Sequence, residues 1–140
     1  MKDNPQWVFP TKFQQNSSVT IMSRMTGFTA AGHTATGVPG EGYWTKPADV
    51  TAIVCEVFDL DGPSPTVPSR SLTVPTSSVF DPPSTDRAIW RKDNVGFNFE
   101  YTVPGDCFPV GGHRYQVKFH TTFVGGETSS FQFVGPCESA

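Results

Sequence analysis

The chain has 140 residues, and its 10 Lys and Arg stand against 13 Asp and Glu for a formal net charge of −3. This length suffices for one domain with a sizeable core, whereas a surface that binds nucleic acid directly needs clustered basic residues, which the sequence lacks. No apolar run reaches the roughly 18 residues of a membrane-spanning helix. The 12 Phe predict a core of few but large side chains.

Residues 1–16 form a polar segment in which Trp7, Phe9 and Phe13 are interspersed with prolines. It is either an extended arm whose aromatic side chains dock on a neighbouring subunit, or a first strand that lies against its own sheet. If it is an arm, removal of residues 1–13 leaves a folded domain that assembles less well. The segment lacks the apolar core of a secretory signal, so we expect synthesis in the cytoplasm without export by the usual route.

Residues 17–25 are predicted to form a strand, and residues 26–47 follow without alternation and with many Gly, Thr and Ala. Irregular segments of this length inside a compact domain often belong to binding. Tyr43 and Trp44 lie at its end. Aromatic side chains on loops are common interface anchors, but these two can equally cap the open end of the fold.

Residues 49–60 are nearly continuous in apolar side chains, which predicts a central strand covered on both faces. Two short strands over residues 71–74 and 77–80 are separated by Pro75, which indicates an edge or a bend because proline has no backbone N–H to donate. A further short strand is predicted over residues 88–90.

The clearest patterns lie in the last third of the chain, where aromatic and β-branched residues alternate with polar ones over residues 97–103 and 115–123. A period of two places successive side chains on opposite faces of a strand. Both segments are therefore predicted to be half-buried antiparallel strands with their aromatic side chains inward. A glycine pair then predicts a hairpin to a final strand that ends at Gly135-Pro136.

These elements predict an all-β fold, an antiparallel β-sandwich of about seven strands over residues 17–140 that follows the N-terminal arm of residues 1–16. Residues 104–117 resemble the link between the last crossing strands of immunoglobulin-like and fibronectin-III-like sandwiches. In those folds a glycine precedes a tyrosine whose hydroxyl locks a corner, and Gly112 and Tyr115 match that pattern. The resemblance covers residues 49–134 and lacks the Cys…Trp…Cys pattern of true immunoglobulin domains.

No cofactor or metal site is predicted. The three cysteines, Cys55, Cys107 and Cys137, are odd in number and have no Cys-x-x-Cys spacing, which argues against a disulfide framework or a zinc knuckle; a Cys107–Cys137 pair stays open. The segment Asp59–Gly62 resembles the start of a calcium loop, but Arg70 stands where the loop needs a bidentate Glu.

No catalytic residues are predicted either. His33, His113 and His120 are widely spaced, and the sequence contains no nucleophile elbow or phosphate-binding glycine loop. Cys107 and His113 lie in one connection, but no acid that would orient His113 is evident. We therefore expect a protein without enzymatic activity.

A fainter resemblance suggests the function. Residues 57–61, 95–99 and 111–117 resemble small β-rich proteins encoded among the structural genes of bacteriophages and prophages. The resemblance implies a virion structural protein, either a head-tail neck or connector component or a capsid decoration (cement) protein. Its expected partners are other virion proteins (capsid, portal or tail proteins) and further copies of itself. The candidate partner-binding residues are aromatic: Trp7, Phe9, Phe13, Tyr43 and Trp44.

The alternative is an immunoglobulin-like adhesion or carbohydrate-binding module. In that case Tyr43, Trp44 and Trp90 would form a platform on which sugar rings stack. The lack of a secretion signal favours the virion hypothesis over this one.

Overall fold

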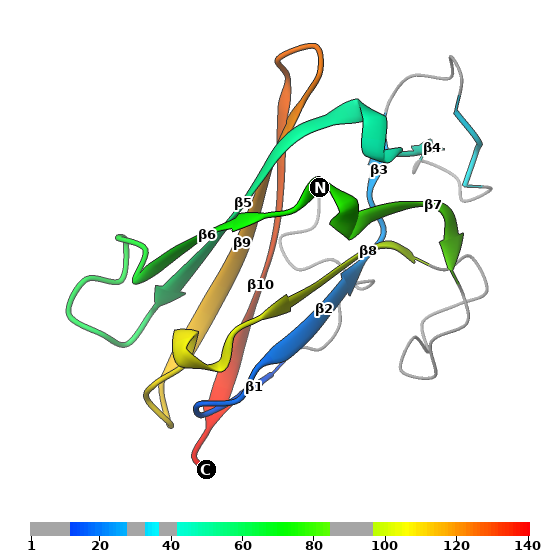
Figure 1. Cartoon of the computed structure of the whole chain (residues 1–140). Coiled ribbons are helices and arrows are strands. Elements are labelled where there is room, and N and C mark those ends of the chain that lie inside the picture. Colours follow the sequence, from blue (N-terminus) through cyan, green and yellow to red (C-terminus); the bar gives the residue numbers. More distant parts are fainter. Residues whose placement is uncertain (1–11, 28–32, 37–41, 85–96) are drawn as a thin grey trace.

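The computed structural model describes residues 12–27, 33–36, 42–84 and 97–140 (Figure 1). Trp7, Phe9, Trp90 and the strand predicted over residues 88–90 lie outside the described residues. Within them, the regular structure is β-strand apart from short 3₁₀ turns at η1 (Pro47–Asp49), η2 (Thr76–Ser78) and η3 (Gly105–Cys107).

The larger sheet has five strands in the order β1-β10-β9-β5-β6. Their bounds are β1 (Phe13–Gln14), β10 (Thr128–Glu138), β9 (Arg114–Phe123), β5 (Val50–Asp59) and β6 (Arg70–Val74). Neighbours in this sheet are antiparallel, except that β1 is parallel to β10. The strand predicted over residues 115–123 is thus the long central strand β9.

The second sheet has three antiparallel strands in the order β2-β8-β7, and a separate ribbon pairs β3 with β4. Their bounds are β2 (Val19–Ser23), β3 (Thr26–Gly27), β4 (Tyr43–Trp44), β7 (Val79–Ser84) and β8 (Phe97–Val103). The two sheets face each other, and the β3–β4 ribbon lies near the start of β5 (Figure 1). This order resembles that of immunoglobulin-like sandwiches; a relationship to that family stays a prediction.

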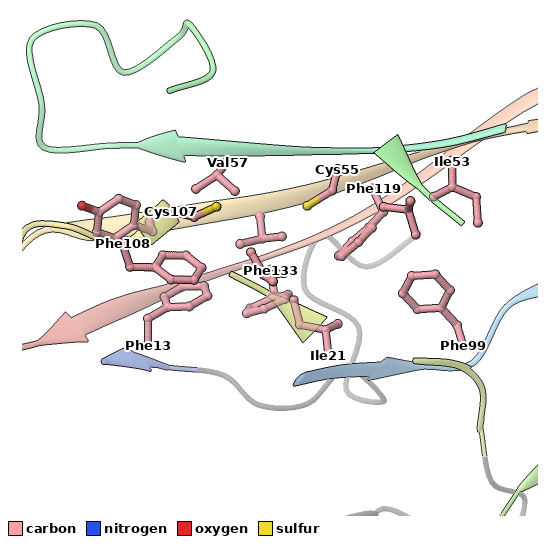
Figure 2. Close-up of a cluster of buried hydrophobic side chains, with 14 of the residues drawn as sticks. Phe13, Ile21, Ile53, Cys55, Val57, Phe99, Cys107, Phe108, Phe119 and Phe133 are labelled. Atoms are coloured by element: carbon pink, nitrogen blue, oxygen red, sulfur yellow. The ribbon is translucent and has the colours of Figure 1, made fainter. Parts of the chain in front are cut away.

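The core fills the space between the sheets, as the alternating aromatic residues predict. Side chains from β5 and β9 meet those from β2 and β8 (Figure 2). Phe99 of β8 packs edge-to-face on Phe119 of β9 with 5.1 Å between ring centroids. The predicted all-β sandwich is therefore confirmed.

Two predictions about single strands are wrong. β5 is covered on one face only, because the second sheet lies against one side of it: Ile53 is 1% exposed and Val54 38% exposed. β10 does not end at Gly135-Pro136 but continues to Glu138. The backbone N–H of Cys137 donates to His113, so the nitrogen of the preceding proline faces away from β9 and no ladder bond is lost.

The start of β8 also departs from its predicted alternation. Phe97, Asn98 and Phe99 are all 0% exposed, although the pattern places Asn98 on the outer face. The pairing register between β7 and β8 shifts here, and Phe97 joins a small separate cluster with Met22 instead of the main core. Asn98 is buried because its amide finds backbone partners on neighbouring segments.

Candidate functional site

A cleft of about 250 Å³ lies at the end of the sandwich where β5 begins and β9 ends. We call this the cleft end. Most of the described residues that line the cleft are polar. They come from β3, the β3–β4 connection, the β4–η1 segment and the β9–β10 hairpin: Thr26, His33, Thr45, Asp49, Phe123, Val124, Gly125, Glu127, Thr128 and Ser129.

Asp49 connects three of the segments around the cleft. Its carboxylate oxygen Oδ2 lies 2.7 Å from Nε2 of His33 and accepts a 2.7 Å hydrogen bond from the backbone N–H of Lys46. Its backbone carbonyl accepts from the N–H of Val124 in the hairpin at 2.9 Å. One residue at the end of η1 therefore fixes the position of both walls.

Asn98 supports the cleft from the second sheet. Its Oδ1 accepts from the N–H of Met25 at 2.6 Å, and its Nδ2 donates to the carbonyls of Met25 and Thr45, each at 2.9 Å. Hydrogen bonds in a buried site are strong because water does not compete for them. The Asn98 side chain thus holds the backbone of Thr45 in place.

Two lining groups have no partner of their own within the described part of the chain. Thr45 is 2% exposed, and its hydroxyl oxygen is buried away from the open space of the cleft and makes no hydrogen bond within the described residues. The carboxylate of Glu127 is exposed on the hairpin, with no ion pair or hydrogen bond to its side chain among the described residues. The hairpin turns at Gly126, whose φ of 90° suits glycine.

The cleft can accept hydrogen bonds and a positive charge. Its described lining contains two carboxylates and several hydroxyls, with no Lys or Arg among them. No group of three His, Cys, Asp or Glu side chains within the described ranges is placed to hold a metal ion.

The opposite end of the sandwich, where β5 ends and β9 begins, carries a different kind of polar cluster. We call it the corner end. The hydroxyl of Tyr115 accepts a 3.1 Å hydrogen bond from the backbone N–H of Val110, which is the contact that the sandwich resemblance implies. Gly112 precedes it with a φ of 86°, a conformation that favours glycine.

The two aspartates of the Asp59–Gly62 segment, which resembles the start of a calcium loop, are both paired at the corner end. Nδ1 of His113 lies 2.9 Å from both carboxylate oxygens of Asp59. Arg114 binds Asp61 with its guanidinium at 2.9 Å and with its backbone N–H at 2.7 Å. Hydrogen bonding from the Arg114 side chain lowers the pKa of Asp61 to about 2. The carboxylates of Asp59 and Asp61 therefore connect the chain at the end of β5 to the chain at the start of β9.

The three cysteines are free and buried. Burial raises the pKa of Cys55 to about 12 and also raises the pKa of Cys107 and Cys137. A protonated, buried thiol is a poor nucleophile. Contrary to expectation, an acid does orient His113, since Nδ1 of His113 lies 2.9 Å from the carboxylate of Asp59. The Cys107 thiol lies 3.9 Å from Oδ1 of Asp106.

The candidate partner-binding residues lie in different surroundings. Phe13 is 2% exposed and stacks on Phe108 and Phe133 at centroid distances of 4.5 and 5.3 Å, so we do not assign it to a partner. Trp44 is 7% exposed, which leaves little surface for stacking on a sugar. Tyr43 is half-buried in the β3–β4 ribbon.

No family model, curated protein or solved structure matches the chain. Among the described residues, no helix has the length and apolar character needed to cross a membrane.

Proposed function

We propose that the chain is a non-enzymatic structural protein of a bacteriophage virion that acts through protein–protein contacts. The choice of a virion follows from the resemblance of residues 57–61, 95–99 and 111–117 to phage structural proteins. Within that class, the protein is a head-tail neck or connector component or a capsid decoration protein. The observation that best supports a contact function is the outer edge of β10.

β10 is paired with β9 from Thr128 to Pro136, but its other edge pairs only at Cys137 and Glu138, with β1. In the described part of the chain, the edge over residues 128–136 therefore has no neighbouring strand. Backbone N–H and C=O groups on such an edge form a template for a strand from another chain.

The arm and this edge begin next to each other. β1 runs parallel to β10, with Phe13 opposite Cys137, so the chain enters β1 near the point where the open edge of β10 ends. If residues 1–11 form an arm that is exchanged between neighbouring copies, this arm would start beside the β10 edge of its own copy and pair with the same edge of the neighbour. Because Phe13 is a core residue, an exchanged arm would have to end before it.

The outer face of the larger sheet offers a second contact surface. Val54 and Val134 are 38% and 39% exposed there, and Val54 lies opposite His120, which pairs with Glu56 at 2.6 Å. Interfaces that form and separate as folded units are about as apolar as the rest of a protein surface, so the composition of this face is compatible with one. This face and the β10 edge support a protein that joins copies or binds to a larger assembly.

The test compares the molecular mass in solution of the full chain with that of a variant lacking residues 2–11. We expect the full chain to form a ring or another closed oligomer, and the truncated chain to be a folded monomer. A neck component would also form rings on isolated portals, whereas a decoration protein would bind preformed shells at saturating stoichiometry. A monomeric full chain that binds neither shells nor portals would overturn the proposal.

The carbohydrate-binding alternative is favoured by one observation, the hydroxyls and carboxylates of the cleft, which are groups that sugars also use. The burial of Trp44 weighs against the aromatic platform on which that alternative depends. Binding on a glycan array that is lost in a Tyr43→Ala variant would favour this alternative over the virion proposal.

A further inference from the structure

We propose that, before assembly, residues 6–11 continue β1 as a strand that runs parallel to β10 and covers the open edge of their own copy. This inference rests on the proposed contact function for its consequence, because exchange of the arm between copies would then begin from this covered form. It is carried by the register of β1 on β10, by the positions of the prolines, by the aromatic side chains and by the uncharged edge.

The register of β1 determines where the preceding residues fall on β10. Phe13 lies opposite Cys137, and the two strands are parallel. If the chain keeps this course, each step back along it moves one residue toward the start of β10, which places residues 6–11 opposite residues 130–135. The edge of β10 is unpaired over residues 128–136 within the described part of the chain, so it has room for this strand.

The hydrogen bonds at the end of β10 show which backbone groups point toward the open edge. The N–H of Cys137 donates to β9, whereas the carbonyl of Glu138 accepts from the N–H of Gln15 on the β1 side. Because successive residues of a strand point their backbone groups in opposite directions, the even-numbered residues of β10 face the open edge. We call three of their N–H groups the edge amides: Ser130, Gln132 and Val134.

The two prolines of the arm fit this alternation. Odd-numbered residues of the arm would direct their N–H groups to β10, as Gln15 does. Pro10 is even-numbered, so its nitrogen would face away from β10 and no ladder bond would be lost, which is the position that proline needs in an edge strand. Pro5 is odd-numbered and has no N–H to donate, so the paired strand begins after it. On β10, Pro136 donates no bond to the arm, so one ladder bond is missing next to β1.

The same register places the aromatic side chains of the arm on the core face. Side chains directly opposite each other on neighbouring strands lie on the same face of a sheet. Trp7 would lie opposite Phe131 and Phe9 opposite Phe133, and both of these β10 residues face the core. Phe131 is only partly buried although it stacks on Phe119 at 5.0 Å, so Trp7 would cover the part that is exposed. A shift by one residue would turn both arm rings to the outer face.

The composition of the open edge is a further reason to expect a cover. Residues 128–135 contain no charged side chain, and natural proteins usually protect such an edge with charges, proline or a covering segment. On the other edge of the same sheet, β6 carries Arg70 and is followed by Pro75. Residues 4–11 are also uncharged, so their pairing with β10 would bury no charge.

The covered form determines how assembly would proceed. The strand of residues 6–11 hides the backbone groups with which β10 would otherwise pair with a neighbouring copy. In the proposed assembly, this strand leaves its own edge and pairs with that of a neighbour, and an exchange of identical elements between copies loses few contacts. Phe13 stays in the core of its own copy in both forms.

The first experiment is amide hydrogen exchange of the full chain by NMR, at a concentration where its mass in solution is that of one copy. We expect the amides of Trp7, Phe9 and Thr11 to exchange at least about tenfold more slowly than those of Gln6 and Val8. This alternation reports the register, because the even-numbered residues of the arm would direct their amides to solvent. Slow exchange at the even-numbered positions, or uniformly fast exchange, would overturn the inference.

A variant lacking residues 2–11 tests the other side of the pairing. Without the arm, we expect the edge amides to exchange at least about tenfold faster than in the full chain. The amides of Phe131 and Phe133 are the matched control, because they point toward β9 and keep their partners there. Edge amides that exchange at the same rate in both chains would show that the arm does not cover them.

Two single variants separate the faces of the arm. Trp7→Ala removes a ring from the core face, and we expect the edge amides to exchange about fivefold faster or more. Val8→Ala is the control on the outer face, and we expect little change there. Equal effects of the two variants would contradict the register.

A nitroxide label on a Gln6→Cys variant identifies the copy to which the arm is bound. The native cysteines are buried, so the label attaches at the new position. With the label on the isotope-enriched chain itself, we expect broadening of the edge amides; with the label on a second, unenriched chain, we expect none at the same low concentration. Broadening in the mixture would place the arm on a neighbour from the start, which would disprove this inference and leave the proposed contact function intact. A covered chain that never assembles would instead disprove the proposed function alone.

Discussion

The two ends of the sandwich are both rich in polar side chains, but they use them differently. At the corner end, the side chains of Asp59, Asp61 and Tyr115 are all engaged by neighbouring residues of the same chain. At the cleft end, the exposed carboxylate of Glu127 has no such partner among the described residues. The first arrangement closes the fold, whereas the second leaves hydrogen-bonding capacity for another molecule.

The comparison teaches that polar residues which attract attention in the sequence are not always the functional ones. The Asp-Leu-Asp-Gly segment and His113 belong to the corner end, where they join β5 to β9. The cleft is assembled from residues that form no motif. Unmet hydrogen-bonding capacity distinguishes the two ends better than residue type does.

The largest effect is expected for Phe13→Ala, which removes an aromatic ring from the core at the corner end. Phe13 contacts the rings of Phe108, Tyr115 and Phe133. Loss of a buried phenylalanine typically costs about 3–5 kcal/mol, and we expect a loss of that size in urea unfolding. Phe58→Ala on the half-buried outer face of β5 is the control with the smaller loss. Equal losses would contradict the assignment of Phe13 to the core.

A smaller effect is expected for Tyr115→Phe, which keeps the ring and removes the hydroxyl that binds the N–H of Val110. A hydrogen bond of this kind contributes about 1 kcal/mol to the free energy of unfolding. Tyr101→Phe is the control, because the Tyr101 hydroxyl makes no hydrogen bond within the described residues; we expect little change there. If both variants unfold at the same denaturant concentration as the parent chain, the Tyr115 hydroxyl does not hold the corner.

The strands and their inward faces could be predicted from the sequence because a period of two is a local property of the chain. The aromatic residues of β9 show this, and Tyr115 was identified by its place after Gly112 at the start of that strand. Local alternation does not reveal whether a face is covered. That depends on the second sheet, which is why β5 is open on one side.

The cleft and Asn98 could not be predicted for a related reason. Asn98 is 73 positions from Met25 in the chain, and its burial depends on backbone groups that only the folded chain brings near it. The cleft likewise brings together Thr45, which follows β4, and Glu127 of the β9–β10 hairpin, which are far apart in the sequence. The long irregular segment of residues 26–47 was the one signal in the sequence that pointed toward this end.

The smallest effect concerns the Asp61–Arg114 pair of the corner end, and it depends on pH. The pKa of Asp61 is lowered from 3.8 to about 2, mainly by hydrogen bonding from the Arg114 side chain, so the folded chain binds a proton less readily than the unfolded chain does. The stabilisation is therefore present above about pH 4 and is lost as the pH falls through about 2. Because the pair is exposed, the effect is small and is reduced by salt.

The measurement is the urea midpoint of the parent chain and of Asp61→Asn at a series of pH values. We expect the parent chain to be slightly more stable near neutral pH, and the difference to shrink toward about pH 2. Arg114→Gln and the double variant complete a cycle that isolates the pair from other effects of either change. A difference that stays constant over the acid range would show that Asp61 acts through its neutral hydrogen bonds, and the corner end would then resemble the cleft end more closely than its charges suggest.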